Sequence, residues 1–230
     1  IAHRPLDTFN AEHHLIGPAG ATRLPIPLRS SIQGLIDGQM ILTLEEDWAA
    51  RDGKSGDLLA MDLAGLKTDA ATVKPVLVLR PTASQAVEQV ATTRNRLIVA
   101  LYDNVKGGVV SFQHGPRGWA STKLDLPQDV SVGVASASDR DDRLILQISG
   151  FLTPSTQVLA DAASGATETL RTLPARFDAS KEVVEQHWAV SKDGTKVPYF
   201  LVRPKDLKFD GAAPTLLYAY GGFQLSQTPG

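Results

Sequence analysis

The stretch Met40-Ile41-Leu42-Thr43-Leu44 decides the fold, because short apolar runs of the same kind recur along the chain. The next run, Leu97-Ile98-Val99-Ala100-Leu101, starts 57 residues later, and Leu144-Ile145-Leu146-Gln147-Ile148 starts a further 47 residues on. Each run is followed by another strand candidate, at residues 57–61, 109–112 and 157–160. Repeats of about 40 to 50 residues made of short antiparallel strands are typical of β-propeller blades. We therefore predict a mainly β fold, a partial β-propeller with antiparallel blades; a β-sandwich would fit the strands but not their spacing.

Turn residues mark the borders of these strands. Asp37-Gly38 and Asp193-Gly194 suit two-residue hairpins, because both central residues of a type I′ turn need positive φ. Arg94-Asn95 and residues 139–142 also separate strand pairs. We interpret the charged cluster at 139–143 as a solvated hairpin tip rather than a metal or substrate site.

The composition is that of an ordinary soluble globular protein. The chain is 43% hydrophobic and 21% charged, and its net charge of −2 leaves no basic excess for nucleic acid. No apolar run approaches the roughly 18 residues of a membrane-spanning helix. We expect neither a nucleic-acid nor a membrane partner. The absence of cysteine excludes disulfides and thiolate chemistry but leaves a cytoplasmic or periplasmic location equally open.

The acidic and histidine residues do not form a convincing metal-binding pattern. Neighbouring side chains of an extended segment point to opposite faces, so His13 and His14 would not readily bind one ion together. His3, His114 and His187 lie in separate contexts. The three adjacent carboxylates Glu45-Glu46-Asp47 leave slightly more room for ion binding. We expect no metal and no cofactor.

A second informative stretch, Leu216-Leu217-Tyr218-Ala219-Tyr220-Gly221-Gly222-Phe223, lies near the end of the chain. Its apolar run without alternation predicts a strand covered on both faces, as in a parallel sheet. A loop leaving such a strand is a common position for an active site. Two glycines after a strand also suit a simple tight turn, and a tyrosine at a strand end commonly only anchors its hydroxyl at a polar boundary.

Together with Ser191-Lys192-Asp193-Gly194-Thr195-Lys196-Val197-Pro198 and Pro214-Thr215, this stretch resembles the start of the hydrolase domain in the prolyl oligopeptidase family of serine peptidases. The resemblance is specific roughly from Gln186 to Pro229. It implies a seven-bladed propeller followed by an α/β-hydrolase domain, and a parent enzyme that cleaves short peptides after proline. It also implies that the Tyr220 hydroxyl is one oxyanion-hole donor and that Phe223 forms a wall of the pocket for the residue preceding the scissile bond.

The residues that would complete a serine peptidase are absent from this sequence. No Gly-x-Ser-x-Gly pentapeptide occurs, and Gly53-Lys54-Ser55-Gly56 has the wrong spacing and suits a turn. We therefore expect residues 1–175 to form about three blades plus partial strands, and residues 176–230 to form the start of the hydrolase domain, truncated before the catalytic serine. This chain alone is expected to be inactive and to self-associate, with short proline-containing peptides as substrates of the parent. The alternative is a non-catalytic propeller that binds partners and carries a degenerate hydrolase segment.

Overall fold

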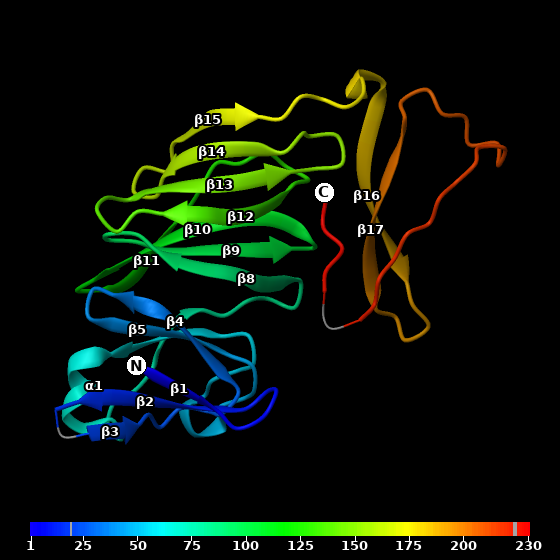
Figure 1. The fold of residues 1–230 in the computed structure, drawn as a ribbon. Helices are drawn as coiled ribbons and strands as arrows, with labels where there is room; N and C mark the ends of the chain where they lie inside the picture. Colours follow the sequence, from blue (N-terminus) through cyan, green and yellow to red (C-terminus); the bar gives the residue numbers. More distant parts are fainter. Residues whose placement is uncertain (19, 223–224) are drawn as a thin grey trace.

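The computed structural model describes residues 1–18, 20–222 and 225–230 and consists mainly of antiparallel β-sheets (Figure 1). A three-stranded sheet comes first, with β1 (Ala2–Pro5), β2 (Ala11–Gly17) and β3 (Gly20–Arg23). Three four-stranded sheets follow, and a separate hairpin comes last. In the described part of the chain no helix has the length and apolar character needed to cross a membrane.

The three four-stranded sheets repeat the same antiparallel meander, in which strands adjacent in sequence are adjacent in the sheet. The first contains β4 (Ser30–Ile36), β5 (Gln39–Leu44), β6 (Leu58–Asp62) and β7 (Val76–Leu79), with helix α1 (Leu63–Asp69) between the last two and a 3₁₀ turn at Ala49–Arg51. The second contains β8 (Gln85–Thr92), β9 (Leu97–Asp103), β10 (Lys106–Gly115) and β11 (Gly118–Lys123). The third contains β12 (Ser131–Ala137), β13 (Arg143–Ser149), β14 (Thr156–Asp161) and β15 (Thr167–Thr172).

The recurring apolar runs become the same strand of each sheet. They form β5, β9 and β13, the second strands, and the strand candidates that follow them form β6, β10 and β14. The sequence prediction of equivalent strands is therefore confirmed. A second strand has a neighbour on both sides in the sheet, which is why its backbone is satisfied without side-chain help.

The core lies between successive sheets, because alternate residues of one strand point to opposite faces. On β5, Met40 and Leu42 pack in the cluster shared with the N-terminal sheet and α1, whereas Ile41 packs in the cluster shared with β9. On β9, Ile98 packs in turn toward the sheet of β13. β5 and β9 are therefore covered on both faces, which explains their continuous apolar runs in an antiparallel sheet, whereas the buried residues of β13 (Leu144, Leu146 and Ile148) share one face.

The tip of the β12–β13 hairpin joins two sheets. The Asp142 carboxylate accepts hydrogen bonds from Thr93 Oγ1 at 2.9 Å and from the backbone N–H of Asn95 at 2.8 Å. Burial acts to raise the pKa of Asp142, but the hydrogen bonds from Asn95 and Thr93 outweigh it and hold the pKa below its ordinary value. Residues 139–143 lie at the hairpin tip as expected, and Asp142 in addition binds a hairpin about fifty residues earlier in the chain.

One of the two predicted tight turns is confirmed. Asp37 and Gly38 both have positive φ and join β4 to β5 as a two-residue loop. Asp193-Gly194 instead lies in a five-residue loop, since Val190 pairs with Lys196 across the last hairpin. Only Gly194 of that pair has positive φ, and the Asp193 carboxylate accepts from the backbone of Thr195.

The C-terminal part of the chain combines one hairpin with a long irregular segment. A 3₁₀ turn at Ala179–Lys181 leads into β16 (Glu182–Val190), which pairs along its whole length with β17 (Lys196–Pro204). The strand predicted over residues 216–220 is not formed in this structure, and the Leu216 side chain is 92% exposed. A strand requires a hydrogen-bonded neighbour, and none of the described residues pairs with this segment.

Candidate functional site

The candidate site lies where the β16–β17 hairpin meets one end of the propeller-like sheets. Figure 1 shows the hairpin standing beside these sheets, with the last residues of the chain running between the two. The sheets contribute the β9–β10 turn and the connection between β13 and β14. We call this contact region the seam.

Two side chains of the hairpin carry contacts across the seam. Gln186 on β16 donates from Nε2 to the backbone carbonyl oxygen of Asn104 in the β9–β10 turn, at 2.6 Å. Phe200 on β17 packs against Phe151 of the β13–β14 connection, with ring centroids 5.4 Å apart. One polar and one aromatic contact therefore fasten the hairpin to two different sheets.

A cavity of about 400 Å³ opens along the seam. Its polar lining includes Asp103, Lys106, Gln85 and Gln186, and the indole of Trp188 lies at its border. With Lys123, which also lines it, the cavity combines amides, one carboxylate and two ammonium groups, a mixture that can hold a polar chain by hydrogen bonds. Among the lining residues there is no serine, cysteine or histidine that could form a nucleophile–base pair.

The end of the chain is anchored to the same face of the sheets. The carbonyl oxygen of Pro229 accepts from the backbone N–H of Ser131, the first residue of β12, at 3.1 Å. Tyr102, near the end of β9, has its pKa raised mainly by burial, while a hydrogen bond with Thr228 acts in the opposite direction. The last residues of the chain are thus fixed to the sheets through their backbone.

Of the two predicted site residues, Tyr220 is the one that the described residues include. Tyr220 lies in the irregular segment, half exposed, with its hydroxyl turned toward Gly222: a Cβ added to Gly222 would come within 2.9 Å of that oxygen. This close approach gives a local reason for glycine at position 222. Phe223 lies outside the described residues.

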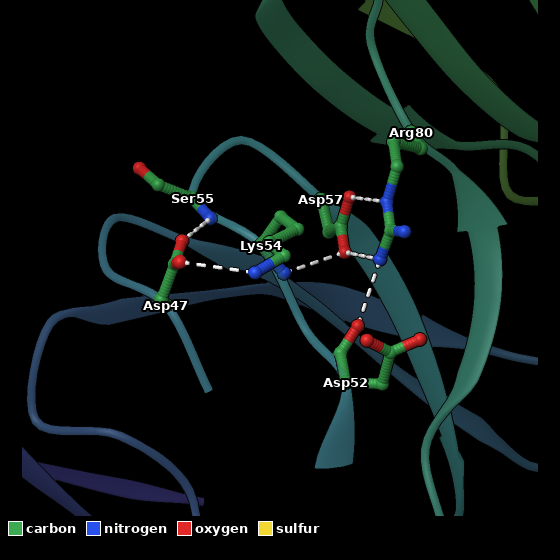
Figure 2. Close-up of polar contacts among 6 residues, drawn as sticks. All are labelled: Asp47, Asp52, Lys54, Ser55, Asp57 and Arg80. Carbon is green, nitrogen blue, oxygen red and sulfur yellow. Dashed lines mark hydrogen bonds and ion pairs between the residues drawn. The ribbon is translucent and has the colours of Figure 1, made fainter. Parts of the chain in front are cut away.

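The three carboxylates at 45–47 point to separate partners. Glu45 accepts from Ser31 Oγ, Glu46 from the backbone N–H of Arg29, and Asp47 from the backbone N–H of Ser55. Figure 2 shows Asp47 beside Lys54 and Ser55. Ser55 therefore lies in a turn, as expected for the stretch that resembles a nucleophile motif.

A buried ion pair organises the loop that contains these residues. Asp57 is fully buried and receives two hydrogen bonds from Arg80, at 2.8 and 2.7 Å, and one from the backbone N–H of Lys54 (Figure 2). Arg80 also donates to the carbonyl oxygen of Asp52. The β5–β6 loop is thereby tied to the segment that follows β7.

Sequence reasoning missed a pair of stacked histidines. His3 and His13 are directly opposite in the register of β1 and β2, and their rings lie 5.1 Å apart. Burial lowers the pKa of His13, whose Nε2 lies 3.0 Å from the Ser30 carbonyl oxygen. Only the strand pairing could have revealed this neighbour. The described residues contain no group of three or more side chains placed to hold a metal ion.

The seam contacts were also missed, because they join residues far apart in sequence. Gln186 and Asn104 are separated by 82 positions, and neither belongs to a recognised motif. The one available signal was the short polar interruption at Asp103-Asn104 between two strand candidates, which predicts a turn but not its partner.

Comparison with known proteins assigns the family. Residues 37–172, well over half of the chain, match the family model for the prolyl oligopeptidase N-terminal β-propeller domain. The chain is 43% identical to the uncharacterized peptidase y4nA of Sinorhizobium fredii, in an alignment that covers 99% of this chain and 32% of that protein. It is 32% identical to the uncharacterized peptidase RP174 of Rickettsia prowazekii, in an alignment that covers 97% of this chain and 32% of that protein. A solved structure of a post-proline cleaving enzyme from Rickettsia typhi superposes with a TM-score of 0.82 at 30% identity, covering 97% of this chain and 33% of that one. The chain thus spans about a third of the length of these relatives, and by the family model and these identities it belongs to the prolyl oligopeptidase family.

Proposed function

We propose that this chain is part of a serine endopeptidase that hydrolyses short peptides after proline. In this proposal residues 1–175 are propeller blades, and residues 176–230 begin the α/β-hydrolase domain. The observation that carries the proposal is the run of propeller sheets that leads, through a docked hairpin, into the Tyr220-Gly221-Gly222-Phe223 motif. The similarity to a post-proline cleaving enzyme supports the choice of substrate.

In the proposed mechanism Tyr220 stabilises negative charge. A serine supplied by the longer protein attacks the peptide carbonyl, and a histidine takes the proton from the serine and passes it to the leaving amine. The Tyr220 hydroxyl donates a hydrogen bond to the oxygen that becomes negative, and Phe223 contacts the proline ring. Because Tyr220 is half exposed in this structure, its ring is accessible to a substrate.

The decisive experiment replaces Tyr220 in the longer protein. Tyr220→Phe keeps the ring and removes the hydroxyl, so a catalytic donor predicts a fall in turnover of about 10²- to 10³-fold. Tyr218→Phe is the matched control, because Tyr218 lies two residues away and is also exposed. A folded Tyr220→Phe enzyme whose turnover on a proline-containing peptide falls less than about threefold, far below the usual loss of an oxyanion donor, would contradict the role.

The chain of 230 residues is itself proposed to be inactive. It should neither hydrolyse a proline-linked chromogenic peptide nor react with a serine-directed phosphonate, since the sequence has no nucleophile elbow. Stoichiometric phosphonate labelling of a serine within this chain would overturn the proposal. If the longer protein also lacked an elbow serine, the proposal would give way to the non-catalytic binding module.

We further propose that the chain self-associates in isolation. Large apolar side chains are exposed in its C-terminal part, among them Leu216, Leu217, Phe209 and Val190. Exposed apolar groups of this size favour association in water. Light scattering should show oligomers that dissociate on dilution, and a monomer at all concentrations would contradict this expectation.

A further inference from the structure

The hairpin contacts the sheets through one cross-strand pair at its centre. Gln186 and Phe200 are directly opposite in the β16–β17 register, and each is the fifth of the nine residues of its strand. Side chains directly opposite in a sheet share a face. One pair therefore carries both the hydrogen bond to Asn104 and the aromatic contact to Phe151.

Burial along the hairpin changes at this pair. Residues 182–186 of β16 are partly buried, whereas residues 187–190 are exposed. Beyond the central pair, Val190 is 68% exposed, and Val197 on the opposite strand is exposed as well. The half of the hairpin that ends in the 191–195 loop is thus the more exposed half, although Trp188 within it still borders the seam cavity.

The partner of Gln186 is a turn held in an unusual conformation. Asn104 and Val105 both have positive φ, at 48° and 60°, and form the two-residue link between β9 and β10. Positive φ is a genuine outlier for a β-branched residue such as Val105 and persists only where the surroundings impose it. The Asn104 backbone N–H donates to the Ser84 carbonyl oxygen at 2.8 Å, and its side chain donates to Asp103. The turn is therefore fixed with its carbonyl oxygen directed at the hairpin.

We propose that the Gln186–Phe200 pair is the pivot on which the hairpin docks, and that Gln186 and Phe200 are positioning residues for the segment that follows β17. The hydrogen bond fixes the hairpin relative to β9–β10, and the aromatic contact fixes it relative to β13–β14. Because β17 leads into the segment with Tyr220, the tilt of the hairpin sets where that segment begins. The docking part of this inference stands on contacts alone, and its catalytic consequence rests on the proposed function.

Trp188 provides a direct readout of docking in this chain. It lies two residues after Gln186, on the same face of β16, and borders the seam cavity. Replacing Trp48 and Trp119 with phenylalanine leaves it as the single tryptophan. Quenching of Trp188 by acrylamide then measures how far the hairpin has left the sheets, and circular dichroism verifies that each variant remains folded.

The sharpest variant is Gln186→Glu, which keeps the size of the side chain and removes the N–H donor. At neutral pH a carboxylate only accepts hydrogen bonds, so it faces the Asn104 carbonyl oxygen without a donor. Loss of one hydrogen bond should shift docking about two- to tenfold toward the undocked state. Below the usual glutamate pKa of about 4.3 the protonated group regains an O–H donor, and Trp188 protection should return.

Matched controls separate this effect from general changes in charge. Gln113→Glu introduces the same charge at an exposed position of β10 and should leave Trp188 quenching unchanged. Asp103, Lys106 and Lys123 line the cavity beside Gln186, so the single-tryptophan parent and Gln186→Ala are measured over the same pH range. Neither of these should show the recovery at low pH that is expected of Gln186→Glu.

The double variant Gln186→Ala/Phe200→Ala removes both contacts and makes the outcome decisive. It should expose Trp188 more than either single variant while the sheets stay folded. Trp188 quenching equal to that of the parent in a folded double variant would overturn the pivot.

In the longer protein Gln186→Glu and Gln186→Ala should both lower turnover at neutral pH, whereas Gln113→Glu should leave it unchanged. If the Gln186 variants undock the hairpin without changing turnover, the catalytic consequence of docking is refuted and the docking pivot stands. If Tyr220→Phe does not slow turnover, the proposed oxyanion role is refuted and the docking pivot is unaffected.

Discussion

Two apolar stretches of this chain adopt different structures: residues 40–44 form a strand, whereas residues 216–220 do not. Both are predicted as strands from their apolar residues, and coverage on both faces is predicted for the second. The first becomes most of β5, with β4 and β6 hydrogen-bonded on either side and Ile41 and Leu42 fully buried. In the second, Leu216 and Leu217 are almost fully exposed and the described residues provide no neighbouring strand. Hydrophobicity thus gives a segment the capacity to form a buried strand, and the presence of partner strands decides whether it does.

Under the proposed function the two stretches would also differ in how far along the chain their partner strands lie. The partners of β5 lie within about twenty residues on either side, across a two-residue turn and one loop. A strand of a parallel sheet needs partners reached through crossover connections of a dozen residues or more. A local meander such as β4, β5 and β6 therefore forms between segments that are neighbours in sequence.

The largest effect should come from truncating the buried stretch. Leu42→Ala removes a fully buried side chain between two sheets and should lower the free energy of unfolding by about 2–5 kcal/mol. Leu216→Ala is the matched exposed control and should change it by less than about 0.5 kcal/mol. Urea unfolding followed by circular dichroism measures both. Equal losses would mean that residues 216–220 are buried in solution, and the comparison would fail.

The next largest effect concerns the ion pair of the β5–β6 loop. Asp57→Ala leaves Arg80 without its carboxylate and the Lys54 N–H without its acceptor. We expect a loss of about 2–3 kcal/mol, below the value for a fully buried pair because Arg80 is partly exposed to water. Asp47→Ala, in the same loop but exposed, should cost clearly less in the same unfolding assay. A larger loss for Asp47→Ala would show that the exposed contacts of Asp47 with Lys54 and Ser55, rather than the Asp57–Arg80 pair, stabilise the loop.

A smaller effect, dependent on pH, is expected at the hairpin tip. The native pKa of Asp142 is depressed, so its contribution to stability is complete above the unfolded value of about 3.9 and disappears as the pH falls through the native pKa. Asp142→Ala should therefore destabilise the chain at neutral pH by about 1–2 kcal/mol, and the gap to wild type should close under acid conditions. Because Asp141 and Asp161 also have lowered pKa values, only the difference between the two proteins is informative. A gap independent of pH would contradict the role of the carboxylate.

The smallest effect is a gain in stability. Val105→Gly places Asn-Gly, the preferred type I′ pair, in the β9–β10 turn and removes a β-branched residue from positive φ. The expected increase is about 0.5–1 kcal/mol, because relief of strain exceeds the greater freedom of glycine in the unfolded chain. Val190→Gly, in an exposed part of a strand, should instead lower stability. A loss for Val105→Gly in thermal unfolding would mean that the valine side chain is needed at the seam.

The features that could be predicted from the sequence are those that depend on residues close together along the chain. The sequence located β5, β9 and β13, the turn at Asp37-Gly38 and the family, because each has a local pattern. It did not predict that Asp142 binds a second hairpin, that His3 stacks on His13 or that Gln186 meets Asn104. These contacts depend on strand register and on how sheets stack, which no single stretch encodes. The roles of Tyr220 and Phe223 remain predictions.

The double-faced burial of β5 has a consequence for the fidelity of folding. In a sheet with one solvent-exposed face, a shift of the register by one residue moves apolar side chains into water and is therefore unfavourable in free energy. A slip of β5 by one residue would replace Met40, Leu42 and Leu44 on one face by Gln39, Ile41 and Thr43, and would so bring two polar side chains into the apolar cluster beside the N-terminal sheet. The Asp37-Gly38 turn and the irregularity in β4 between Ile32 and Gly34 fix the same alignment from outside the core. The turn, the irregularity in β4 and the polar residues Gln39 and Thr43 thus all select the same pairing for a strand that is buried on both faces.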